Sequence, residues 1–157
     1  ILSVTKFPER VFPVGRLDKD SHGLIILTND GRITDRLLSP KYVHEKEYIV
    51  KVEPNFTHKF IELMSSGVRF DRYVSKKCEV WPYKTRTGES KNIFNIILTE
   101  GKKRQIRRMC EALHHKVIDL KRIRIMNVNI GSLKDGEYKK IEGKELETFL
   151  NLLGLGK

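Results

Sequence analysis

Strand-like segments outnumber helix-like segments along this chain, and the two kinds do not alternate in a regular strand–helix–strand order. The strand-like segments are residues 11–14, 23–28, 47–53, 78–83, 93–98 and 117–130, and the helix-like segments are residues 32–38, 57–64, 103–113 and 146–153. Parallel strands need a crossover connection, usually a helix, between them. The order therefore predicts an α+β domain with a mixed, mainly antiparallel sheet and flanking helices.

Two segments carry this prediction most clearly. In residues 47–53, the side chains of Tyr48, Val50 and Val52 occupy every second position, as in a half-buried strand. Residues 103–113 place four apolar side chains on one helical face: Ile106, Met109, Cys110 and Leu113. A chain of 157 residues is long enough to form one domain around its own core.

The charge of the chain indicates a polyanionic partner. Lys and Arg number 31 against 20 Asp and Glu, which gives a formal net charge of +11. Residues 100–125 hold nine basic and three acidic side chains, and thus +6 of this charge. Basic side chains that neutralise phosphates release condensed counterions, so a nucleic acid is the expected partner. From charge alone, a solvated lysine-rich face explains the segment equally well.

Other classes of protein are disfavoured by the sequence. No apolar run approaches the roughly 20 residues of a membrane-spanning helix. Cys78 and Cys110 form neither a disulfide framework nor a zinc-binding spacing, which favours a reducing, cytoplasmic compartment. The five histidines show no metal-ligand spacing, and no metal site is predicted.

Three segments could carry chemistry, although each has an ordinary structural explanation. Asp18 stands in a turn-prone stretch before a buried strand, where acids commonly accept backbone hydrogen bonds. Tyr48 opens an apolar strand, where tyrosines commonly serve packing. Residues 101–109 lead through a glycine and a basic turn into a helix, and could either bind an anion or form a solvated face.

Taken together and in this order, the three segments are more specific. They are GRLDKDSHGLIILTNDG at residues 15–31, HEKEYIVKV at 44–52, and EGKKRQIRRMCEALHHKVIDLKRIRI at 100–125. The chain resembles the RsuA/RluB/RluE/RluF family of ribosomal-RNA pseudouridine synthases, and the sequences of its motifs are most similar to those of the RluF type. The resemblance extends from about residue 11 to the final leucine-rich helix and implies the pseudouridine synthase catalytic fold.

The resemblance implies three catalytic residues. Asp18, in the GRLD motif, would be the nucleophile that adds to the uracil ring or to the anomeric carbon. Tyr48, in the KxY motif, would stack on the target base and help to remove the C5 proton. Arg107, which follows Gln-Ile, would form an ion pair with Asp18 and keep it charged. The isomerisation implies no cofactor and no metal.

The resemblance also implies residues that bind the RNA. Ile106 would line the pocket, Lys46 would support it by charge, and Arg16 would fill the gap left by a flipped nucleotide. The candidates for phosphate contacts are Arg104, Arg108, Lys121, Arg122 and Arg124.

Such enzymes usually carry a Lys-Pro-containing strand and a small RNA-binding domain ahead of the GRLD motif. Only 14 residues precede Gly15, so residues 1–157 are expected to be a catalytic domain truncated at its N-terminus. The expected activity is the isomerisation of uridine to pseudouridine in structured RNA. The partner would be large-subunit ribosomal RNA, with transfer RNA as a further candidate, and the protein would be a cytoplasmic monomer.

Two other functions are compatible with parts of the pattern. A non-catalytic RNA-binding module would explain the charge but not the motif around Asp18. A carboxylate-dependent hydrolase of glycosidic bonds normally uses two acids with distinct roles, whereas Asp18 alone lies in a specific motif. Release of free uracil would be the signature of that second alternative.

Overall fold

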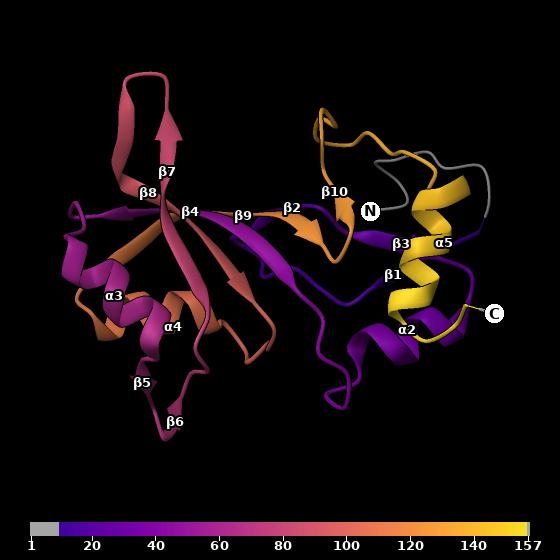
Figure 1. The fold of residues 1–157 in the computed structure, drawn as a ribbon, viewed down its shortest axis with the longest axis horizontal. Helices are drawn as coiled ribbons and strands as arrows, with labels where there is room; N and C mark the ends of the chain where they lie inside the picture. Colours follow the sequence, from indigo (N-terminus) through magenta and orange to yellow (C-terminus); the bar gives the residue numbers. More distant parts are fainter. Residues whose placement is uncertain (1–9, 157) are drawn as a thin grey trace.

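A computed structural model of the chain describes residues 10–156 (Figure 1). The first nine residues of the expected 1–157 domain lie outside the described part. The strands are β1 (Phe12–Val14), β2 (His22–Gly23), β3 (Ile26–Thr28), β4 (Lys46–Glu53), β5 (Arg69–Phe70), β6 (Tyr73–Val74), β7 (Glu79–Thr85), β8 (Gly88–Leu98), β9 (Lys116–Ile125) and β10 (Val128–Asn129). The helices are α2 (Gly31–Leu38), α3 (His58–Ser66), α4 (Gln105–Ala112) and α5 (Gly143–Leu152).

The main sheet has the strand order β10–β9–β4–β8–β7, and all of these neighbours are antiparallel. The short strand β2 pairs in parallel with β9 and makes the sheet mixed. Two further antiparallel pairs, β1–β3 and β5–β6, lie outside this sheet. The predicted α+β class with a mixed, mainly antiparallel sheet is confirmed.

One core lies between the sheet and the helices α3 and α4, which Figure 1 shows together on one side of it. Val50 and Val52 of β4 are fully buried, as their alternation predicts. Met109 and Cys110 of α4 are also fully buried, since the apolar positions of that helix fall on one face.

A second core lies at the other end of the molecule, where α2 and α5 pack beside the β1–β3 pair (Figure 1). Ile33 and Leu37 of α2 and Phe149 of α5 are buried there. Asp30 caps α2, because its side chain accepts a hydrogen bond from the Arg32 N–H at 3.0 Å. Asn29-Asp30-Gly31 therefore has an architectural role.

The predicted strand at residues 23–28 is divided into β2 and β3. Gly23 has a φ of +115°, and a Cβ there would lie 2.2 Å from the Arg122 carbonyl oxygen. Only glycine allows the chain to approach β9 so closely and then turn away to pair with β1. The segment that follows Asp18 therefore contributes both to the main sheet and to the β1–β3 pair.

Candidate active site

A cavity of about 310 Å³ opens where the two cores meet. Its lining includes seven of the residues predicted for the site: Arg16, Asp18, Lys46, Tyr48, Arg104, Ile106 and Arg122. These residues come from the segment after β1, from β4 and β9, and from the start of α4. Lys102 and Lys103, both exposed, also line the cavity.

Asp18 lies in the turn between β1 and β2. The turn is closed by the Ser21 N–H, which donates to the Asp18 carbonyl oxygen at 2.9 Å. The Asp18 side chain is half-buried and lines the cavity. Within residues 10–156, its carboxylate forms no hydrogen bond or ion pair. The carboxylate is therefore available to a ligand.

Tyr48 lies on β4, in the middle of the sheet. Its cross-strand partners are Ile96 on β8 and Arg122 on β9. Burial raises the pKa of the Tyr48 hydroxyl, the positive charge of Arg122 opposes that rise, and the negative charge of Asp18 adds to it. The tyrosine therefore faces both the candidate nucleophile and a buried cation.

Lys46 and Ile106 complete the inner part of the cavity. Burial lowers the pKa of the Lys46 ammonium, and the nearby charge of Arg122 lowers it further. Ile106 is buried in the first turn of α4 and presents an apolar surface to the cavity. Both residues line the cavity together with Asp18 and Tyr48.

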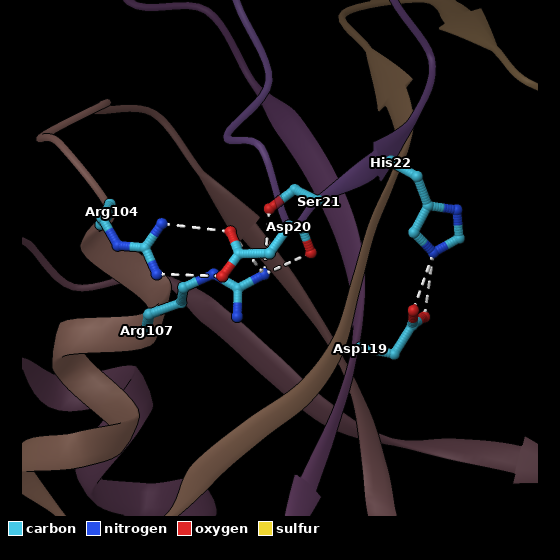
Figure 2. A network of polar contacts seen from close by, with 6 residues as sticks. All are labelled: Asp20, Ser21, His22, Arg104, Arg107 and Asp119. Carbon is cyan, nitrogen blue, oxygen red and sulfur yellow. Dashed lines mark hydrogen bonds and ion pairs between the residues drawn. The ribbon is translucent and has the colours of Figure 1, made fainter.

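The predicted ion pair between Arg107 and Asp18 is wrong. The Arg107 guanidinium instead donates to the Asp20 carbonyl oxygen at 2.7 Å and to Ser21 Oγ at 3.2 Å, and it lies 3.3 Å from the Asp20 carboxylate (Figure 2). The turn directs the Asp18 side chain into the cavity and the Asp20 side chain toward α4, so the arginine meets the second acid.

Asp20 is not among the residues predicted for the site, and its contacts are those of an acid that holds a turn. Arg104 donates two hydrogen bonds to its carboxylate, both at 3.1 Å, in a forked pair (Figure 2). These bonds hold the pKa of Asp20 below its usual value. Asp20 thus joins the start of α4 to the turn that carries Asp18. Its position two residues after Asp18 is the only signal in the sequence.

Three predicted phosphate contacts do not line the cavity. Arg108 forms an ion pair with Asp71 at 3.0 Å. Arg124 donates to Glu47 at 3.1 Å and to the Met126 carbonyl oxygen at 2.6 Å. Lys121 pairs with Ile49 across β4 and β9.

A register shift explains why Arg122 and Arg124 face different ways. Tyr48 is opposite Arg122, but its neighbour Glu47 is opposite Arg124, so one extra residue of β9 lies between the two pairs. Such a bulge places side chains two positions apart on opposite faces of a sheet. Arg122 is only 6% exposed, and its Nε donates to the Leu24 carbonyl oxygen at 2.9 Å. This candidate for a phosphate contact is therefore buried at the cavity rather than exposed on the surface.

Glu100 organises the rim of the cavity, and the sequence reasoning missed it as well. Its carboxylate accepts hydrogen bonds from the Tyr73 hydroxyl, from the Lys76 N–H at 2.8 Å and from Gln105 Nε2 at 2.8 Å. Burial alone would raise the pKa of Glu100, but these three donors lower it below its usual value. Lys102 is held beside this cluster, with its Nζ 4.7 Å from the centre of the Tyr73 ring.

Over residues 10–156, no three His, Cys, Asp or Glu side chains gather in a way that could hold a metal ion. In the same part of the chain, no helix has the length and apolar composition needed to cross a membrane.

Comparison with known proteins identifies the family. The sequence pattern of the RNA pseudouridylate synthase family matches residues 4–112. The chain belongs to this family. The match covers the GRLD and KxY motifs and all of α4, whereas β9 lies beyond it.

Individual relatives agree with this result. The dual-specificity RNA pseudouridine synthase RluF of Escherichia coli (strain K12) is 42% identical over 153 residues, which are 98% of this chain and 51% of that protein. The ribosomal large subunit pseudouridine synthase B of Bacillus subtilis is 32% identical over 150 residues, 96% of this chain and 62% of that protein. The expected likeness to RluF-type enzymes is confirmed. The chain spans about half the length of the RluF proteins it matches.

Solved structures share the fold. A crystal structure of a pseudouridylate synthase has a TM-score of 0.78 and 30% sequence identity, over 88% of this chain and 59% of that one. A chain in an H/ACA RNP bound to a substrate RNA has a TM-score of 0.55 at 17% identity, over 82% of this chain and 42% of that one. At that identity, the second likeness concerns the fold alone.

Proposed function

We propose that this chain isomerises uridine to pseudouridine in structured RNA. One observation carries the proposal: a half-buried Asp18 carboxylate, which forms no hydrogen bond within the described residues, lines the same cavity as Tyr48 and Lys46 in a chain of the RNA pseudouridylate synthase family. A carboxylate kept free of donors retains its nucleophilicity, and the basic side chains around the cavity suit a phosphate backbone.

Each residue has a part in the proposed reaction. The Asp18 carboxylate adds to the uracil ring or to the anomeric carbon, and the N1–C1′ bond breaks. The uracil turns, a C5–C1′ bond forms, and the Asp18 adduct is released. Tyr48 stacks on the base and takes the C5 proton, while N1, freed from C1′, gains a proton from water, so product and substrate are isomers. Arg107 acts indirectly in this scheme, because it holds the turn that aims Asp18.

Large-subunit ribosomal RNA is the proposed substrate. Support comes from the relative in Bacillus subtilis, whose name states the ribosomal large subunit. The RluF protein of Escherichia coli is named dual-specificity, and transfer RNA is therefore included as a second proposed substrate. An RNA base must leave its helix to enter a cavity of this kind, and Arg16 at the cavity edge is the side chain proposed to occupy the vacated place.

We further propose that residues 1–157 form the catalytic domain and act as a monomer in the cytoplasm. Two observations support a catalytic role for this part of the chain. The cavity draws on both cores, and the family match includes the segments that carry Asp18, Tyr48 and Ile106.

Chromatography of digested RNA tests the proposal. Unmodified ribosomal RNA, which contains uridine but no pseudouridine, is incubated with the protein and then digested to nucleosides. Uridine, pseudouridine and free uracil are then separated. The proposal predicts pseudouridine in molar balance with the lost uridine, and no free uracil. Free uracil would indicate a glycosidic hydrolase instead. RNA that is bound with none of its uridine lost would indicate a binding module.

A further inference from the structure

Arg122 is a buried cation whose hydrogen-bonding capacity is only partly used. Its Nε donates to the Leu24 carbonyl oxygen at 2.9 Å. Its Nη2 is buried and has no hydrogen-bond acceptor among residues 10–156. Buried polar atoms without a partner are rare in folded proteins and commonly mark a functional requirement. The two neighbours of Arg122 in the fold, Tyr48 and the segment after Asp18, suggest which requirement this is.

The position of Arg122 joins these two catalytic elements. It is the direct cross-strand partner of Tyr48 in the β4–β9 pair, and both side chains line the cavity. Its backbone carbonyl oxygen accepts from the Leu24 N–H at 2.8 Å, while its side chain donates to the Leu24 carbonyl oxygen. Arg122 therefore links the chain that follows Asp18 to the strand that carries Tyr48.

Arg122 is the cation that lowers the pKa of the Tyr48 hydroxyl. Burial raises the pKa of Tyr48, Arg122 lowers it, and Asp18 raises it. The other ionisable groups that line the cavity are Arg16, His22, Lys46, Glu100, Lys102, Lys103 and Arg104. Arg122 is the guanidinium placed directly across the strand pair from Tyr48.

We propose that Arg122 is a positioning residue that acts through Tyr48 and stabilises the phenolate form in which Tyr48 takes the C5 proton. The inference rests on the proposed function. In that step the C5–H bond breaks, its electron pair restores the ring double bond, and the proton forms an O–H bond with the tyrosine oxygen. The neutral tyrosine then returns its proton to water before the next turnover. A preorganised charge beside the oxygen favours the phenolate without any rearrangement.

Single-turnover release of tritium from C5-labelled RNA, measured from pH 6 to 10, tests this role. Arg122→Gln is expected to lower the rate at neutral pH by about a hundredfold, as for the loss of one preorganised charged donor. Because the pKa of Tyr48 lies above its usual value of 10.0, the rates of parent and variant are both expected to rise with pH while the deficit persists. Arg122→Lys keeps the charge and is expected to lose about tenfold or less while keeping the pH dependence of the parent.

A double-mutant cycle separates this role from a purely structural one. If Arg122 acts through Tyr48, Arg122→Gln should cost less than about threefold in a Tyr48→Phe background. If the two losses multiply, or if Arg122→Gln keeps the parent's rate and pH profile, the inference is overturned. Should Arg122→Gln fail to melt cooperatively, the same cycle is run with Arg122→Lys, whose cost must likewise disappear when the Tyr48 hydroxyl is absent.

Lys116→Met is the matched control, because Lys116 is an exposed basic residue at the far end of the same strand. It should leave the rate and the pH profile unchanged. The activity of the parent protein separates a failure of the proposed function from a failure of the proposed role of Arg122. A parent that releases no tritium contradicts the proposed function itself, whereas an active parent with an unaffected Arg122→Gln variant contradicts only the role of Arg122.

Discussion

Asp18 and Asp20 lie two positions apart in one turn but have opposite surroundings. The Asp20 carboxylate is held by the forked pair from Arg104 and lies beside Arg107. The Asp18 carboxylate lines the cavity and has no such partner in the described part of the chain. An acid that is already neutralised by two guanidinium groups is a poor nucleophile, and the geometry therefore favours Asp18.

At this scale the sequence predicts which residues meet at the cavity better than it predicts their partners. The motifs around Asp18 and Tyr48 predict two residues that line one cavity. The partners of Arg107 and the burial of Arg122 depend on how distant segments meet, and no local pattern predicts them. The bulge in β9 shows this most clearly, since simple alternation would place Arg122 and Arg124 on one face.

Replacing Tyr48 tests its chemical role at the residue scale. Tyr48→Phe removes the hydroxyl but keeps the ring, so stacking on the target base should be retained. We expect the single-turnover rate to fall by about 10²- to 10⁴-fold, the range of general acid–base catalysis. The dissociation constant for RNA, measured by filter retention, should change by less than about threefold. An unchanged rate would remove Tyr48 from the mechanism.

At the scale of elements, the cavity depends on two segments that approach unusually closely. The pairing of β2 with β9 brings the turn with Asp18 to the strand with Arg122. The segment before α4 is held by Glu100, through donors from the β5–β6 side and from α4 itself. The existence of most helices and strands is predictable from periodicity, whereas these approaches are not, because they involve non-local contacts.

Gly23→Ala tests the approach of β2 to β9. Alanine is strained at a φ of +115°, and its Cβ would lie 2.2 Å from the Arg122 carbonyl oxygen. We expect the free energy of unfolding, measured by urea denaturation, to fall by about 2 kcal/mol or more. Gly31→Ala is the control, because a Cβ at Gly31 would meet nothing within 4 Å. Equal stability of the two variants would contradict the close approach.

Glu100→Gln tests the rim of the cavity through its pH dependence. The pKa of Glu100 is lower in the folded chain than its usual value of 4.5. Its stabilising effect is therefore present above about pH 4.5 and is lost as the pH falls through the lower folded value. We expect the melting temperature at pH 7 to fall by about 2–4 °C, and the difference from the parent to vanish in acid.

Glu147→Gln is the matched control for Glu100, since Glu147 is an exposed acid on α5. Calorimetric melting at pH 7 and pH 3 should show no effect of this control at either pH. If Glu100→Gln behaves like the control, the hydrogen bonds around Glu100 do not stabilise the rim.

At the scale of the whole molecule, two cores are joined at a basic cavity. The net charge of +11 and the exposed Lys102 and Lys103 at the cavity suit the proposed RNA partner. The fold class and the family could be predicted from the sequence, since strand order and motif order are both visible in it. The division into two cores could not, because it follows from the split of residues 23–28 between two sheets.

The salt dependence of RNA binding tests this surface. For each phosphate contact removed, the slope of log Kobs against log salt concentration should become shallower by about 0.7–0.9. We expect that change for Lys102→Met and for Lys103→Met. Lys59→Met, on the exposed side of α3, should leave the slope unchanged. Equal slopes for all four proteins would show that RNA binds elsewhere.

The most direct test of Asp18 as the nucleophile is tritium release by variants in which Asp18 and Asp20 are replaced one at a time. RNA labelled at uracil C5 is incubated with the parent, with Asp18→Asn and with Asp20→Asn. Moving the glycosidic bond to C5 must expel that hydrogen into water. We expect release by the parent, none detectable with Asp18→Asn, and a loss of about tenfold or less with Asp20→Asn, which only loosens the turn. Release by Asp18→Asn at the rate of the parent would contradict the assignment of Asp18 as the nucleophile.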